Sequence, residues 1–267
     1  MDKSNHFEIN RLSWNIRTDI HIQSEFYNNE KFIQGGTSLN QIELDLLGDI
    51  KGKKILHLQC HFGQDTISLS RLGAEVTGID LSDIGIERAK ELAKKTGSNA
   101  KFICCNLYEL PDHLEQKFDL IFTSYGTIVW LPDLTKWAAI VAQFIKPTGK
   151  FIFVEFHPFL WMYDDEFKGI KYNYFNTGKI YEIEEGSYTD SEDKVNLESV
   201  TWNHSLSEVM NSLIDQGLII RSFHEYNYNP YNCFKNSFKV SEKKYRIHSF
   251  NDHVPMVYSV VAQNPKK

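Results

Sequence analysis

Cysteine is scarce in this chain of 267 residues, and its arrangement excludes two classes of protein. The four cysteines form no CxxC pair, and two of them, Cys104 and Cys105, are adjacent within a strand-like run. This pattern is not that of a disulfide scaffold or a zinc site. The sequence therefore predicts reduced thiols, no metal centre and a cytoplasmic location.

Long apolar runs and an excess of positive charge are also missing. No stretch has the ~20 apolar residues of a membrane-spanning helix, and the amino-terminal segment MDKSNHFEINRLSWN lacks the apolar core of a signal peptide. The net charge is -6, and the one basic run that we find, KVSEKKYR at 239–246, is typical of a solvated face. We therefore expect neither a membrane nor a nucleic acid as partner.

From residue 53 onward the hydrophobic pattern alternates between the periods of a strand and of a helix. This alternation predicts an α/β fold with a doubly wound, mostly parallel sheet and helices on both of its faces. The predicted strands are 54–60, 74–80, 100–106, 118–124 and 150–156, and the predicted helices are 64–73, 82–97 and 133–145.

The flanking segments complete a single domain that spans residues 1–267. Residues 1–50 have a helical pattern, whereas 157–203 are rich in turn residues and aromatics and predict an insertion with short strands. A helix follows at 205–218, where Ser205 and Glu208 form a capping box. A strand, a long loop and a last strand at 254–264 then predict an antiparallel edge of the sheet.

Ligands of doubly wound folds bind at the carboxyl ends of the strands, which here are Gln59, Asp80, Asn106, Ser124 and Glu155. Asp80 follows the first loop by about 20 residues, the spacing of a carboxylate that bonds ribose hydroxyls.

Two cofactors fit that spacing, and the first loop decides between them. Its sequence, QCHFG, lacks the glycine pattern that a dinucleotide pyrophosphate needs. Asp65 also begins the following helix, where its charge would repel a phosphate. An NAD-dependent dehydrogenase is therefore disfavoured, and S-adenosylmethionine, which has no phosphate, is favoured.

Residues 53–156 resemble the class I S-adenosylmethionine-dependent methyltransferases, a Rossmann-like family. The segments that carry the resemblance are HLQCHFG, VTGIDLS, CCNLYELP, FDLIFTSYGTIVWLPDL and FIKPTGKFIFVEFHP. The glycine loop diverges, because Gln59 and His61 stand where the family has glycines and only Gly63 remains. His57 stands where the family has an acidic residue, and a histidine within a strand is more often a core residue than a catalyst.

The resemblance implies S-adenosylmethionine as cofactor and a set of residues around it. Asp80 would bind the ribose, Gln59 and His61 the methionine end, and Gly63 would let the backbone pass close to the cofactor. Asn106 would donate to the adenine and Leu107 would pack on its ring. The full set of implied cofactor-binding residues is Tyr27, Gln59, His61, Gly63, Asp80, Leu81, Asn106, Leu107 and Ser124.

Methyl transfer depends mainly on proximity and orientation, and a base is needed only if the acceptor must lose a proton. Glu155 and His157 are the candidate catalytic residues, because two positions apart on a strand they share one face. His157 precedes Pro158 and could instead shape a turn. The family also implies that residues 1–50 form a lid, with Trp14, Phe26 and Tyr27 offering aromatic faces to the sulfonium.

The acceptor is predicted by exclusion. The segment TSYG after the fourth predicted strand lacks the Pro-Pro-aromatic run typical of methylation on DNA amino groups, and no Pro-Cys nucleophile follows it. With the acidic composition, these absences favour a small-molecule acceptor whose pocket is framed by 157–203. A non-catalytic S-adenosylmethionine-binding or interaction protein is the alternative, and the oligomeric state stays open.

Overall fold

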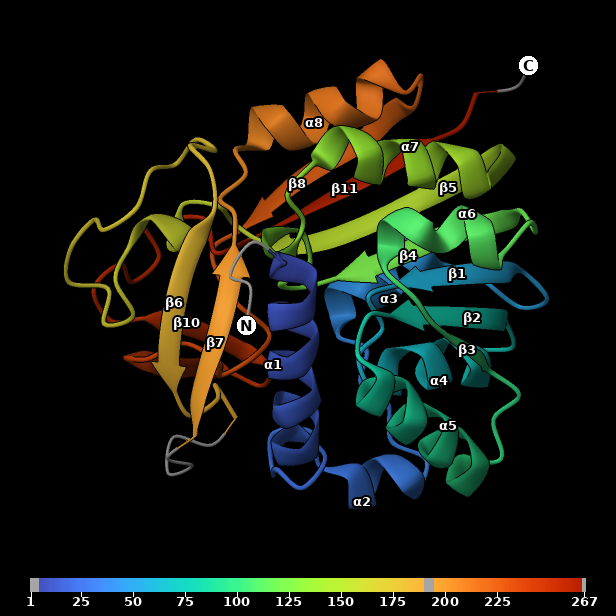
Figure 1. Ribbon diagram of the computed structural model, residues 1–267, viewed down its shortest axis with the longest axis horizontal. Helices are drawn as coiled ribbons and strands as arrows, with labels where there is room; N and C mark the ends of the chain where they lie inside the picture. Colours follow the sequence, from blue (N-terminus) through green and yellow to red (C-terminus); the bar gives the residue numbers. More distant parts are fainter. Residues whose placement is uncertain (1–4, 190–194, 266–267) are drawn as a thin grey trace.

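The computed structural model describes residues 5–189 and 195–265, and a seven-stranded sheet forms its centre (Figure 1). The strand order is β3-β2-β1-β4-β5-β11-β8. Strands β1 to β5 pair in parallel, and β11 is antiparallel to both of its neighbours. The predicted doubly wound, mostly parallel sheet is confirmed. The strands are β1 Lys54–Leu58, β2 Glu75–Asp80, β3 Lys101–Cys104, β4 Phe118–Ser124, β5 Ile145–Phe156, β8 Ile219–Tyr226 and β11 Val257–Gln263.

The last strand is antiparallel to both of its neighbours, and together with β8 it closes this edge of the sheet, as predicted. Strand β11 lies between β5 and β8, and β8 forms the edge. The reason is composition: the segment VYSVVAQ of β11 is buried at five of its seven positions, whereas β8 alternates between half-buried and exposed residues. The more apolar strand therefore occupies the interior position.

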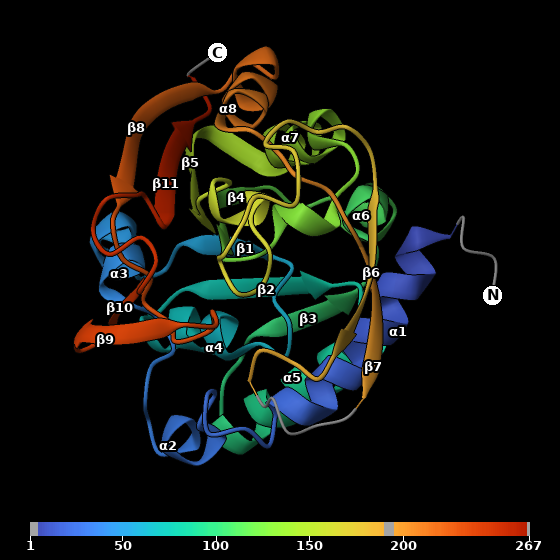
Figure 2. The same cartoon turned by 90° about the vertical axis from the view of Figure 1, so that its left-hand side faces the viewer.

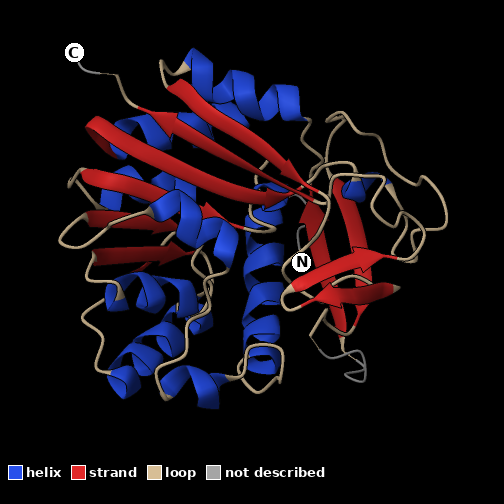
Figure 3. Ribbon diagram, turned by 180° about the vertical axis from the view of Figure 1, so that it is seen from behind, coloured by secondary structure: helices blue, strands red, loops and turns tan. Residues whose placement is uncertain are grey.

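Helices cover both faces of the sheet (Figure 3). One face packs on α7 and α8, where Trp137 is fully buried and meets Phe151 edge to face at 5.5 Å between ring centres. Helices α3 and α4 pack on the other face, and α5 covers its end beside β3. The helices are α3 Gln41–Leu47, α4 Gln64–Arg71, α5 Asp83–Thr96, α6 Leu110–His113, α7 Leu134–Phe144 and α8 Leu206–Asp215, with short 3₁₀ turns η1 Leu107–Glu109, η2 Ile128–Trp130 and η3 Leu160–Met162.

The ends of α5 follow from its sequence. Ser82 caps the first turn by accepting a hydrogen bond from the Gly85 amide at 2.8 Å, and Gly97 ends the helix with a left-handed φ of 65°. Ser205 caps α8 in the same way, through the Glu208 amide at 3.2 Å. The predicted helix range of 82–97 and the predicted cap at Ser205 agree with these contacts.

The amino-terminal segment lies across the carboxyl ends of the parallel strands (Figures 1 and 2). It contains α1 His6–His21 and α2 Asn29–Ile33. On its far side α1 packs against a two-stranded sheet of β6 Ile180–Glu185 and β7 Asn196–Thr201, which comes from the segment predicted as an insertion. Residues 1–4 and 190–194 of these two segments lie outside the described residues.

Two hydrogen bonds of one asparagine join α1 to β7. The Asn10 side chain donates to the Val200 carbonyl at 2.8 Å and accepts from the Val200 amide at 2.9 Å. Asn10 is 1% exposed, so these bonds have no competition from water. A single side chain therefore acts as a further strand residue along β7.

The predicted long loop before the last strand contains an additional hairpin. Strands β9 Ser237–Ser241 and β10 Lys244–Ile247 pair antiparallel, and Lys243 makes the turn with a left-handed φ of 52°. The basic run KVSEKKYR therefore forms most of a hairpin and its turn, and its charged residues are exposed as expected except for the half-buried Arg246.

No helix among the described residues is both long and apolar enough to cross a bilayer. A search of residues 5–189 and 195–265 finds no group of three or more histidine, cysteine or acidic side chains that could coordinate a metal ion.

Replacing Asn10 with alanine should lower the free energy of unfolding by about 1–3 kcal/mol, because the amide and carbonyl of Val200 would lose their buried partner. Urea denaturation at pH 8 measures this. Asn211→Ala is the matched control, since Asn211 is exposed on α8. Equal stability of both variants and the parent would contradict the role of Asn10.

Candidate functional site

The loop between β1 and α4 bends through three left-handed residues. Gln59 has a φ of 53°, His61 of 51° and Gly63 of 83°. Residues with a side chain rarely adopt this conformation, so the surrounding structure must stabilise it. The Cys60 amide donates to the Ile79 carbonyl at 2.8 Å, and the His61 amide donates to Asp80 at 2.7 Å. Both bonds tie the loop to the end of β2.

Asp80 ends β2, and its carboxylate bonds both the β1–α4 loop and the residue that caps α5. One of its carboxylate oxygens accepts from His61, and the other accepts from the Ser82 amide at 2.9 Å. Burial raises the pKa of Asp80, and the hydrogen bonds from Ser82 and His61 oppose that rise. Each oxygen retains a second lone pair, so the carboxylate can also accept hydroxyl donors.

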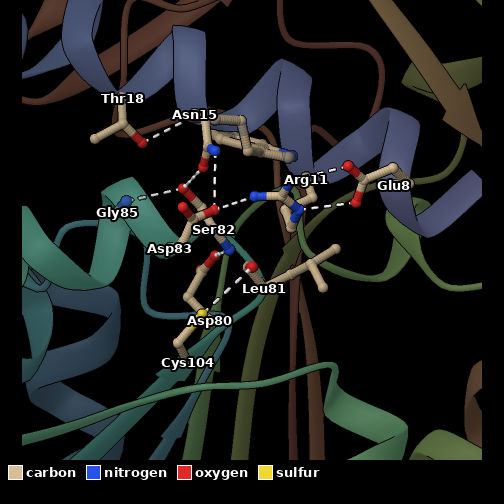
Figure 4. Close-up of polar contacts among 11 residues, drawn as sticks. Glu8, Arg11, Asn15, Thr18, Asp80, Leu81, Ser82, Asp83, Gly85 and Cys104 are labelled. Carbon is tan, nitrogen blue, oxygen red and sulfur yellow. Dashed lines mark hydrogen bonds and ion pairs between the residues drawn. The ribbon is translucent and has the colours of Figure 1, made fainter.

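Helix α1 is fixed over this carboxylate by polar contacts with the start of α5 (Figure 4). The Ser82 hydroxyl donates to Asn15 at 2.7 Å, and Arg11 forms an ion pair with Asp83. Arg11 also meets Glu8 at 2.8 Å within the helix. These contacts place the inner face of α1 against the β1–α4 loop.

Two histidines connect α1 to the loop. Nδ1 of His21 lies 2.9 Å from Nε2 of His61, and Nε2 of His21 lies 2.6 Å from the Ser187 hydroxyl. The Trp14 ring packs edge to face on His61 at 5.2 Å. Burial lowers the pKa of His21 to about 2, aided by the charges of His61 and Arg17, and lowers that of His61 to about 3. Both imidazoles are therefore neutral at pH 7.

Several buried polar atoms beside the loop have no hydrogen-bond partner among the described residues. Gln59 donates through Nε2 to the Thr127 carbonyl at 2.9 Å, but its Oε1 has no partner. Nδ1 of His61 and Nε of Arg17 also lack a hydrogen-bond partner. The terminal nitrogen of Arg17 forms an ion pair with Glu184 at 2.5 Å. Buried groups without partners are costly, so these atoms point to a polar ligand at the loop.

The segment after β3 places Asn106 and Leu107 differently. The Asn106 side chain accepts from the Tyr108 amide at 3.1 Å and caps η1 at the edge of the site. Leu107, predicted to pack on an adenine, is instead 5% exposed and belongs to the core beneath α7. Leu81 is half-buried beside Asp80, and its carbonyl accepts from the Cys104 thiol at 3.7 Å.

Gly63 has a packing role in addition to the close approach to the cofactor that was predicted for it. A Cβ on Gly63 would lie 2.7 Å from the Phe102 ring and 3.0 Å from Ala89. The absent side chain lets the start of α4 pack against β3 and α5. Gly63 is therefore needed for its left-handed φ and for this packing.

Glu155 was predicted as a catalytic residue, but its carboxylate is already used by the backbone. It is 1% exposed and accepts from the amides of Gly126, Thr127 at 2.7 Å, Ile128 at 3.3 Å and Phe156 at 2.7 Å. Burial raises its pKa, and these hydrogen bonds oppose the rise. A carboxylate so occupied positions the loop after β4 and is not free to accept a proton from a substrate.

His157, the other predicted catalytic residue, points away from the β1–α4 loop. Its Nε2 lies 3.0 Å from Glu225 on the edge strand β8, and its Nδ1 accepts from the Phe159 amide at 3.1 Å. The imidazole is 6% exposed, and burial lowers its pKa while Glu225 opposes this. The histidine shapes the turn after β5, as the alternative interpretation held.

The remaining predicted residues surround the loop. The Tyr27 ring packs on Phe62 at 4.8 Å and stacks on His21 at 5.3 Å. Ser124 donates through its hydroxyl to Asp65 at 3.0 Å, at the start of α4. His57 is 3% exposed and pairs with the Thr66 hydroxyl at 2.8 Å, which confirms it as a core residue.

Residues 55–149 match the family described as "Methyltransferase domain". This match identifies a methyltransferase domain at these residues. Curated relatives agree over this region: the ubiquinone biosynthesis O-methyltransferase of Alkalilimnicola ehrlichii is 31% identical over 119 residues, and that of Coxiella burnetii is 34% identical over 104. These matches cover 43% and 39% of this chain and 48% and 44% of the relatives, so the chain spans about half the length of the curated relatives it matches.

Solved structures extend the likeness of fold beyond the methyltransferase domain. An S-adenosylmethionine-dependent methyltransferase from Clostridium acetobutylicum superposes with a TM-score of 0.57 at 17% identity, over 92% of this chain and 94% of that one. A DhpI–SAH complex superposes with a TM-score of 0.57 at 16% identity, over 99% and 100% of the two chains. At these identities the likeness concerns the fold alone.

The sequence prediction missed Arg17 and His21 beside the methyltransferase domain. Both lie on α1, and with Trp14 they follow the spacing i, i+3, i+7 that places residues on one helical face. A buried arginine and histidine in line with a tryptophan was the signal. It was overlooked because polar residues on a helix are usually exposed.

Stability should fall as the pH is lowered from about 7 to 5, because the buried histidines are neutral in the fold and gain protons on unfolding. The native pKa values of His21 and His61 are about 2 and about 3, whereas an unfolded histidine titrates near 6.5. The unfolded chain therefore binds more protons below about pH 6.5, and each such histidine contributes up to about 1.4 kcal/mol per pH unit there.

Urea denaturation at pH 8, 7, 6 and 5 measures this dependence. His61→Gln should flatten it, and His113→Gln, a change at an exposed position of α6, should not. If the slope of stability against pH is unchanged in His61→Gln, then His61 binds a proton in the folded protein as readily as in the unfolded chain.

Proposed function

We propose that the protein binds S-adenosylmethionine at the β1–α4 loop and transfers its methyl group to a small-molecule acceptor. The observation that carries this proposal is the pairing of the left-handed loop with Asp80 at 2.7 Å, beside buried polar atoms that lack partners. The methyltransferase domain at 55–149 and the O-methyltransferases among the relatives support the reaction class.

The residues present fit the cofactor. The free lone pairs of Asp80 would accept the ribose hydroxyls, and Oε1 of Gln59 would accept from the methionine ammonium. Arg17 supplies a buried guanidinium for the methionine carboxylate. Asn106 and Leu81 would border the adenine.

When bound, the cofactor supplies a methyl group that the neighbouring sulfonium activates. The protein then has to orient the acceptor and exclude water. Because Glu155 serves the backbone and His157 pairs with Glu225, a general base on β5 is not part of the proposal.

The amino-terminal segment fits the role of a lid, and residues 157–203 that of a pocket wall. Trp14 and His21 cover the loop from α1, while Ser187 and Tyr188 approach them from the segment after β6. An acceptor would lie between these two segments and the end of β4. The acidic overall composition and the enclosed position favour a small molecule over a nucleic acid.

Asp80→Ala should weaken S-adenosylhomocysteine binding by about 1.5–3 kcal/mol, or about 10- to 150-fold in Kd, because charge-assisted hydrogen bonds to the ribose are lost. Isothermal titration calorimetry measures the change, and a thermal melt verifies that the variant is folded. Asp215→Ala is the matched control, since that carboxylate is exposed at the end of α8. Near-native affinity of a folded Asp80→Ala would remove this residue from the site.

Transfer of labelled methyl from the cofactor into a metabolite extract would separate catalysis from binding alone. Labelled product that forms with the parent and decreases with Asp80→Ala supports the methyltransferase. Cofactor binding without any labelled product would favour a non-catalytic binding protein.

A further inference from the structure

Five aromatic rings form a continuous cluster beside the β1–α4 loop. The Tyr125 ring meets Tyr231 at 5.1 Å, Tyr231 stacks on Phe26 at 5.8 Å, and Phe26 meets Tyr188 at 5.6 Å. The hydroxyls of Tyr188 and Tyr27 lie 2.5 Å apart. These residues come from four separate parts of the chain, and we refer to them as the tyrosine cluster.

The tyrosine cluster connects the proposed cofactor loop with the end of β4. Tyr27 contacts His61 at 5.7 Å between ring centres, and Tyr125 directly follows Ser124, the last residue of β4. None of the five rings is fully buried, and Tyr188 is 41% exposed. Rings that remain accessible at the carboxyl edge of the sheet offer a surface to a ligand rather than to the core.

Two carboxylates border the tyrosine cluster. Glu43 of α3 is 1% exposed and accepts a hydrogen bond from the Tyr125 hydroxyl and another from the Asn40 amide. Asp65 of α4 is half-buried and accepts from Ser124 at 3.0 Å.

Neither carboxylate forms an ion pair with any residue in 5–189 or 195–265. The charge of Lys243 lowers the pKa of Glu43 from a distance, because the Lys243 ammonium itself donates to the Leu39 carbonyl at 3.4 Å. Arg17, near Tyr188, is bound to Glu184. Both carboxylates therefore border the tyrosine cluster without a cation bonded to them.

The pKa of Glu43 reflects the missing cationic partner, and at pH 7 its carboxyl is partly protonated. Burial raises the pKa of Glu43 to about 7, and the charge of Asp65 adds to the rise. The pKa values of Tyr125 and Tyr231 are raised mainly by burial and further by both carboxylates. Burial of a carboxylate without a cationic partner is unfavourable, so a cation at this position would be stabilised.

We propose that the tyrosine cluster is part of the acceptor site and that it holds a cationic aliphatic ammonium group of a small-molecule acceptor, apart from the atom that receives the methyl group. Aromatic faces attract cations, and the two carboxylates supply the opposite charge. An acidic acceptor would be repelled by Glu43 and Asp65. This inference rests on the proposed function, since it places the ammonium group beside the cofactor loop.

Tyr125 is the residue that sets this specificity. It has a left-handed φ of 36°, a conformation that is costly for an aromatic residue. The hydrogen bond to Glu43 and the ring contact with Tyr231 keep its side chain in the tyrosine cluster. Its ring and its carboxylate partner are thereby presented together.

The test uses the full chain saturated with S-adenosylhomocysteine and two probes of equal shape. Choline is a cation, and 3,3-dimethylbutan-1-ol is its neutral isostere. Calorimetry should show that choline binds at least about 5-fold more tightly, the scale of a cation at a partly desolvated aromatic site. Equal affinities, or no binding of choline at up to 50-fold over the protein, would overturn the proposal.

Variants locate the site. Tyr125→Leu and Tyr231→Leu should each weaken choline binding by about 5- to 30-fold without changing the affinity for S-adenosylhomocysteine. Tyr125→Phe keeps the ring and should retain most of the affinity. Tyr226→Leu is the matched control, because that tyrosine lies on the edge strand β8 and bonds Ser259 at 3.3 Å. Unchanged choline binding in both leucine variants would place the ammonium group elsewhere.

The comparison of the two probes uses the parent protein, so it tests the proposal even if a substituted variant fails to fold. If S-adenosylhomocysteine itself fails to bind the parent protein, the proposed function fails. If it binds while choline has no advantage over its isostere, only the acceptor assignment fails.

Discussion

The hydrogen bond from the His61 amide to Asp80 is the contact on which the site depends. It keeps the β1–α4 loop in a left-handed path that side chains alone would disfavour. With the loop so placed, the His61 ring meets His21 and Trp14 and thereby sets the position of α1. Helix α1 in turn carries Asn10 to β7, so one carboxylate at the end of β2 is linked to a sheet far from it in sequence.

A second carboxylate has a comparable role at the end of β5. Glu155 gathers the amides of 126–128 just after β4, and Gln59 then bonds the Thr127 carbonyl from the opposite side. The two loops that border the proposed cofactor are therefore fixed by buried carboxylates that bind backbone. Such preorganisation suits a reaction that depends on orientation more than on proton transfer.

The sequence was sufficient for the sheet because its strands are continuous apolar runs, the signature of parallel strands buried on both faces. It was also sufficient for the caps of α5, which depend on neighbours within a few residues. It failed where the partner is distant. The packing of Gly63 beside Phe102 and the pairing of His157 with Glu225 bring together residues that are distant in the sequence. No local sequence pattern predicts such pairs.

The spacing of two residues predicted that Glu155 and His157 share one face of a strand. It could not predict which groups these two side chains bond. Leu107 illustrates the same limit, because the motif assigned its side chain to the ligand, whereas it packs in the core beneath α7. The hairpin of β9 and β10 was missed for another reason. Its strands are short and rich in charge, so their alternation was weaker than the signal of a solvated loop.

The place of β11 has a consequence for how the chain folds. Because β11 pairs with β5 on one side and β8 on the other, the edge strand has no neighbour until Val257–Gln263 arrives. Contacts between residues 150 and 263 close the largest loop in the sheet, and such long-range pairing is slow. During synthesis, β5 therefore presents an open, apolar edge until residues 257–263 have left the ribosome, which makes this the interval in which the sheet most needs protection from aggregation.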